Sequence, residues 1–77
     1  MGDTTMDVLT GPQRTPDERG HLAETAGILD VTPALSPDIP WWAVHVLYRL
    51  AGWDRCPAAM ADVAIATAMG IAMKDLL

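Results

Sequence analysis

The stretch with the clearest pattern is residues 41–75, which read WWAVHVLYRLAGWDRCPAAMADVAIATAMGIAMKD. Its first segment places apolar side chains at the spacing of one helix face: Ala43, Val44, Leu47, Leu50 and Ala51. Gly52 can then end a helix in the left-handed conformation. We therefore predict a helix over about 38–51, with Leu47 as a core residue.

A second apolar segment follows a short turn. Pro57 suits the first position of a helix, because the N–H that it lacks has no partner inside the helix there. The segment then repeats large apolar residues at spacings of four, four and three: Ile65, Met69, Met73 and Leu76. This pattern predicts a helix over about 57–75, packed as a helical hairpin against the first.

An N-terminal helix signal precedes both segments. Thr15 can cap the free N–H groups, Pro16 fits the first helical position, and Glu18 can complete a reciprocal capping box. Apolar residues then recur at i, i+4 and i+7: Leu22, Ala26 and Leu29. We predict a short helix at roughly 16–29.

The predicted fold class is all-α, a small domain of two or three helices. Residues 1–14 are polar and interrupted by Gly11 and Pro12, which favours a flexible acidic arm. Residues 15–77 would then form a single small helical domain. With 77 residues, one domain is the expected ceiling.

Composition excludes several classes of site. Cys56 is the only cysteine, so the chain holds neither an internal disulfide nor a cysteine-rich zinc site. Residues 1–40 carry seven acids against two arginines, a net charge of −5, whereas residues 41–77 balance at zero. An acidic half repels a phosphate backbone, and the predicted helix at 57–75 starts without base-reading side chains. We expect no nucleic acid, metal or cofactor.

Catalytic side chains are sparse. The candidates are His21, His45 and Cys56, and no third residue is placed to orient a Cys56–His45 pair. A short chain also leaves little room for a substrate pocket. The sequence therefore predicts a protein that is not an enzyme.

The three tryptophans and the methionines carry the strongest functional signal. Tryptophan is enriched in binding hot spots, and methionine suits adaptable binding surfaces. We expect a protein-interaction module or a small subunit of an assembly, bound to another protein or to itself as a homo-oligomer. The expected partner-binding residues are Trp41, Trp42, Trp53, Met69 and Met73.

Two alternatives come from other classes. One is a small acidic regulator, an inhibitor or antitoxin-like protein, whose N-terminal half binds a basic protein. The other is a membrane-associated helical peptide, which Asp62 disfavours because a charge is costly in hydrocarbon. The acidic residues 1–20 are unlike a secretory signal, and a single cysteine fits a reducing compartment. A cytoplasmic location is the expectation.

Overall fold

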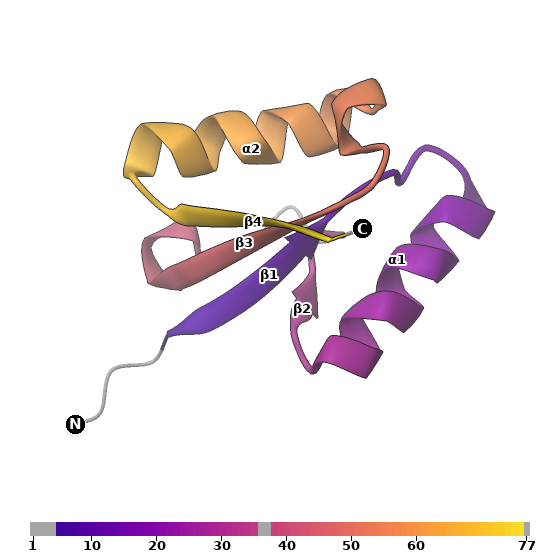
Figure 1. Cartoon of the computed structure of the whole chain (residues 1–77), viewed down its shortest axis with the longest axis horizontal. Coiled ribbons are helices and arrows are strands. Elements are labelled where there is room, and N and C mark those ends of the chain that lie inside the picture. The colour runs from indigo at the N-terminus through magenta and orange to yellow at the C-terminus, as the bar shows by residue number, and fades with distance from the viewer. Residues whose placement is uncertain (1–4, 36–37, 77) are drawn as a thin grey trace.

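The chain folds as an α/β protein in a computed structural model that describes residues 5–35 and 38–76. Over these residues, strands and helices alternate along the sequence (Figure 1). The strands are β1 (Met6–Thr10), β2 (Thr32–Pro33), β3 (Val44–Leu50) and β4 (Ala72–Leu76). The α-helices are α1 (Pro16–Leu29) and α2 (Pro57–Met69), and short 3₁₀ turns are η1 (Trp41–Ala43) and η2 (Trp53–Arg55).

The strands form one parallel sheet in the order β2-β1-β3-β4. Figure 1 shows α1 on one side of the sheet and α2 on the other. The prediction of an all-α domain built on a helical hairpin is therefore wrong. Covering both faces of the sheet explains why its central strands are apolar on both sides rather than alternating.

The predicted helix at 38–51 is replaced by η1 and β3. The β3 sequence VHVLYRL is rich in β-branched, aromatic and leucine side chains, and a short apolar run of this kind is compatible with either a buried strand or a helix. Pairing decides between them, since β3 has β1 on one side and β4 on the other.

The predicted helix at 57–75 begins where expected but ends early. α2 starts at Pro57 and stops at Met69, where Gly70 takes the left-handed conformation with φ 72°. The Gly70 N–H then closes the helix by donating to the carbonyls of Ala66 and Thr67. Residues 72–75 of the predicted helix form part of β4 (Ala72–Leu76) instead.

The flexible arm predicted at 1–14 is also corrected. Its residues 1–4 lie outside the described residues, but Met6–Thr10 form β1, an inner strand of the sheet. Val8 and Leu9 are fully buried, one toward each face. Three apolar residues in this short segment suffice because its backbone pairs with both β2 and β3.

The predicted helix at 16–29 is confirmed, with bounds Pro16–Leu29. Its capping box forms as expected: the Thr15 hydroxyl accepts from the Glu18 N–H at 3.1 Å, and the Glu18 carboxylate accepts from the Thr15 N–H at 3.2 Å. Local chemistry dictates this helix start, which is why the sequence alone reveals it.

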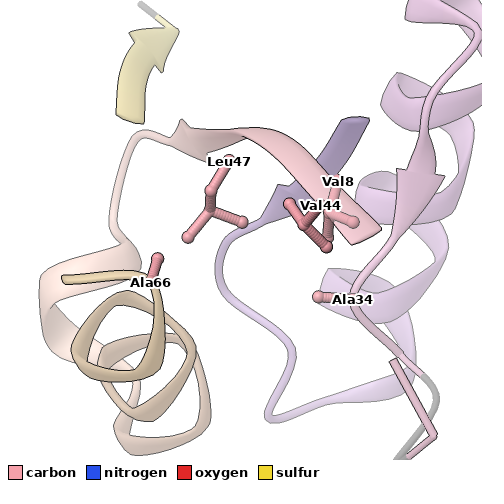
Figure 2. Close-up of a cluster of buried hydrophobic side chains, with 5 residues drawn as sticks. All are labelled: Val8, Ala34, Val44, Leu47 and Ala66. Carbon is pink, nitrogen blue, oxygen red and sulfur yellow. The ribbon is translucent and has the colours of Figure 1, made fainter. Parts of the chain in front are cut away.

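The core has two parts, one on each face of the sheet. The part beneath α2 joins Val8, Ala34, Val44, Leu47 and Ala66 (Figure 2). The part beneath α1 is smaller and joins Leu9, Leu22 and Ala26. The connection from β2 to β3 also packs on the α2 side, through Ile39 and Trp41. Parallel pairing of β1 with β3 places the carboxyl ends of these two strands side by side.

Candidate ligand site at the carboxyl ends of β1 and β3

The sheet has a topological switch point between β1 and β3. From β1 the chain passes through α1 to β2 on one side, and from β3 it passes through α2 to β4 on the other. The loops that follow these two strands therefore diverge to opposite faces of the sheet. In open parallel sheets, ligands bind in the crevice that this divergence leaves at the carboxyl ends.

A pocket of about 290 Å³ occupies that position. Its lining comes from the segment after β1 and the segment after β3: Pro12, Arg14, Glu18, Gly52, Arg55 and Cys56. We call this pocket the switch-point crevice. Every lining residue belongs to a loop, a 3₁₀ turn or the first turn of α1.

Two glycines allow the two loops to approach each other. Gly11 is buried, and a Cβ on it would lie 2.7 Å from the Leu50 Cβ. Gly52 has φ 95°, and a Cβ there would lie 2.9 Å from the Pro12 Cγ. A side chain at either position would push the loops apart, so both glycines set the width of the crevice.

The carboxylate of the crevice has hydrogen-bond partners within the chain, whereas its two guanidinium groups have no acidic partner among the described residues. Glu18 is held by the capping box and also accepts from the Arg14 N–H at 2.8 Å. The one ion pair within residues 5–35 and 38–76 joins Arg49 to Asp75, which leaves the guanidinium groups of Arg14 and Arg55 without an acidic partner there. Two arginines on separate loops are thus available to a ligand.

A buried hydroxyl and a carboxyl meet at the same end of β1. Thr10, the last residue of β1, is fully buried and donates its hydroxyl to the Asp62 carboxylate of α2 at 2.8 Å. Burial raises the pKa of Asp62 above its ordinary value of 3.8, while hydrogen bonds from the side chains of Thr10 and Gln13 act in the opposite direction. Asp62 lies outside the crevice lining, so its interactions connect α2 to β1 and the loop that follows.

We expect Asp62→Asn to raise the melting temperature at pH 7. A raised pKa means that the folded state binds the proton more tightly than the unfolded chain does. The resulting stabilisation is present below the unfolded pKa and is lost as the pH rises through the folded pKa. Asparagine keeps an oxygen for the Thr10 hydroxyl without the charge.

Thermal unfolding from pH 3.5 to 7 measures this effect, with the exposed Asp54→Asn as the control for net charge. The gain from Asp62→Asn should shrink as the pH falls toward 3.8, the ordinary pKa. A variant less stable than the parent at pH 7 would contradict the assignment of burial as the dominant influence.

A second, larger pocket of about 410 Å³ lies at the amino-terminal end of the sheet, opposite the switch-point crevice. It is bordered by the amino ends of the strands and includes Asp7, Asp30 and His45. Across the described part of the chain, no group of three or more His, Cys, Asp or Glu side chains is placed to hold a metal ion. Open parallel sheets bind ligands at the carboxyl ends of their strands, so we favour the carboxyl-end site despite its smaller volume.

The structure separates the five predicted partner-binding residues. Trp42 is 82% exposed and Met69 is 49% exposed, whereas Trp41 and Met73 pack against the core beneath α2. Trp53 follows β3 at the other end, with the Arg49 guanidinium 4.8 Å from the centre of its ring. The tryptophans therefore lie at opposite ends of β3 and do not form one surface.

The switch-point crevice was missed by sequence reasoning. Arg14 and Arg55 each lie in a turn, and only recognition of strands before them would have placed both at one edge of a sheet. Gly11 and Pro12 directly after Thr10 are typical of a turn at the end of a strand. The prediction of a flexible arm over 1–14 missed this strand, β1.

Comparisons with known proteins add no family to this picture: no family model matches the chain, and neither curated proteins nor solved structures contain a significant match. Among the helices of the described residues, none is long and apolar enough to cross a membrane.

Proposed function

We propose that the protein binds a small molecule in the switch-point crevice. The observation that carries this proposal is the position of the pocket, between the loops that follow β1 and β3 where the strand order reverses. Parallel sheets bind ligands at this point because their loops diverge there and leave backbone and side-chain groups unpaired. The crevice also holds two arginines free of acidic partners within the described chain.

A fragment screen followed by ¹⁵N–¹H correlation spectra tests the proposal on the full chain. We expect compounds that bind to shift the amide signals of Arg14, Gly52, Arg55 and Cys56. Shifts confined to Thr5, Asp7, Thr32 and His45 would move the site to the larger pocket at the amino-terminal end of the sheet. A library without any compound that shifts the crevice signals would contradict the proposal.

Protein binding is a second candidate, favoured by exposed apolar side chains. Trp42 is 82% exposed, and α2 exposes Met60, Ile65 and Met69 by 46%, 39% and 49%. A 13-residue helix whose single charged residue is Asp62 presents an unusually apolar surface. The partner is then another protein or a second copy of the chain, as the composition led us to expect.

The molar mass in solution, measured by light scattering over a range of concentrations, tests self-association through α2. We expect Met69→Glu to shift any dimer toward monomer because it places a charge in the apolar contact. Ala23→Glu, at an exposed position of α1, adds the same single negative charge and is the matched control. A dimer that withstands Met69→Glu would remove this end of α2 from the contact.

The acidic-regulator hypothesis fits the fold less well. In that hypothesis the first 40 residues fold onto a basic protein. Those residues include β1, which pairs with β3 and contributes Val8 and Leu9 to the two parts of the core. Releasing β1 onto a partner would expose both faces of the sheet.

A further inference from the structure

We infer that the switch-point crevice takes a ligand with a phosphate group, a small phosphate-bearing molecule rather than a neutral one. This inference rests on the proposed function and names the ligand class of the same site. Its basis is the juxtaposition of Arg14 and Arg55 across the crevice, together with an uncapped helix start beside them.

The charge of the crevice is opposite in sign to that of the chain. Arg14 and Arg55 against Glu18 give the lining a formal charge of +1, whereas the whole chain carries −5. The carboxylate of Glu18 is also occupied by the N–H groups of Arg14 and Thr15 at 2.8 and 3.2 Å. An anion in the crevice is therefore attracted by the charges of Arg14 and Arg55, which line it.

The placement of the arginines favours phosphate over carboxylate. Arg14 follows β1 and Arg55 follows β3, so they reach the crevice from its two separate walls. A carboxylate has two oxygens and is satisfied by one guanidinium fork. A phosphate monoester has three terminal oxygens and a charge near −2, and it can accept from both arginines at once.

The start of α2 adds a positive potential at this site. Cys56, the residue at the N-cap of α2, lines the crevice and makes no side-chain capping hydrogen bond. By contrast, α1 begins with a complete capping box. The positive end of the 13-residue α2 therefore lies beside the crevice and complements the arginines.

The volume of the crevice limits the ligand. A pocket of about 290 Å³ lies just below the usual range for small-molecule sites, which begins near 300 Å³. It accommodates a phosphate with a compact organic part such as a single ring. A dinucleotide would extend well beyond it.

Titrations of the full chain with phenyl phosphate, benzoate and benzamide test the inference, followed by ¹⁵N–¹H correlation spectra. These probes share a ring and carry a phosphate, a carboxylate and a neutral amide. We expect phenyl phosphate to bind about tenfold or more tightly than benzoate, and benzamide to bind most weakly. Added salt should weaken phenyl phosphate binding.

Inorganic phosphate is titrated in parallel to ask whether the free anion is enough for binding. If its affinity equals that of phenyl phosphate, the site binds inorganic phosphate, and the inference that the ligand has an organic part is wrong.

Substitution of the two arginines tests whether Arg14 and Arg55 bind the phosphate group. Arg14→Ala and Arg55→Ala should each weaken phenyl phosphate binding roughly tenfold or more, since each removes hydrogen bonds to a charged group. Lys74→Ala removes one positive charge from β4, outside the crevice lining, and should leave the affinity within about twofold. Both arginines are exposed, and the dispersion of the same spectra reports whether the variants remain folded.

The outcomes separate the two proposals. Benzamide binding as tightly as phenyl phosphate, with shifts at Gly52 and Cys56, would overturn the phosphate inference and leave the proposed crevice intact. Phenyl phosphate binding that both arginine variants preserve would also overturn it. Failure of all probes, together with a fragment screen that leaves the crevice signals unchanged, would remove both proposals.

Discussion

Leu47→Ala is expected to destabilise the protein by about 2–5 kcal/mol, the usual range for a buried leucine. Leu47 is fully buried in β3, beneath Ala66 of α2 and beside Val44 (Figure 2). A 77-residue domain has a total stability of about 4–12 kcal/mol. The substitution therefore removes a large part of that stability, and urea unfolding followed by circular dichroism measures the loss.

Leu29→Ala provides the matched control. Leu29 is the last residue of α1 and is 41% exposed, so the same truncation leaves a smaller cavity. We expect its cost to fall well below that of Leu47→Ala. Equal effects of the two substitutions would mean that Leu47 does not anchor the layer between β3 and α2.

Gly11→Ala and Gly20→Ala are expected to change stability in opposite directions. A Cβ on Gly11 would lie 2.7 Å from the Leu50 Cβ, an atom fixed to the backbone of β3 that no rotamer can move away. We expect a loss of about 1–3 kcal/mol from overpacking. Gly20 lies within α1 with nothing within 4 Å of a Cβ, so alanine should stabilise the helix by about 0.5–1 kcal/mol.

Urea unfolding of the two variants beside the parent chain measures both effects. Because the substitution is the same, the difference between them isolates the surroundings of each glycine. A Gly11→Ala protein as stable as the parent would show that the β1–α1 junction can move away from β3. The width of the switch-point crevice would then not be set by Gly11.

The two arginines of the crevice illustrate what a local pattern leaves out. Arg14 and Arg55 are far apart in the sequence, and each lies in a polar turn with no motif of its own. They become neighbours because β1 pairs with β3 in parallel, with Leu9 opposite Tyr48 and Thr10 opposite Arg49. A site assembled by strand pairing is visible only once the pairing is known.

The sequence by itself determined the features that depend on neighbouring residues. It placed α1 at Pro16–Leu29 through the Thr15–Glu18 capping box, and it placed the start of α2 at Pro57. It also identified Leu47 as a core residue, which the structure confirms. Capping and proline preferences act over a few residues and remain the same in any fold.

Tertiary structure alone decided the fold class. The run VHVLYRL places apolar side chains at neighbouring as well as alternate positions, so its strand period of two is hidden and a helix is also compatible. Its backbone becomes a strand because β1 and β4 satisfy its hydrogen bonds on both sides, and α1 and α2 bury the two faces of the sheet. Those partners come from both ends of the chain, so the free energy that selects the strand comes from contacts that no local pattern contains.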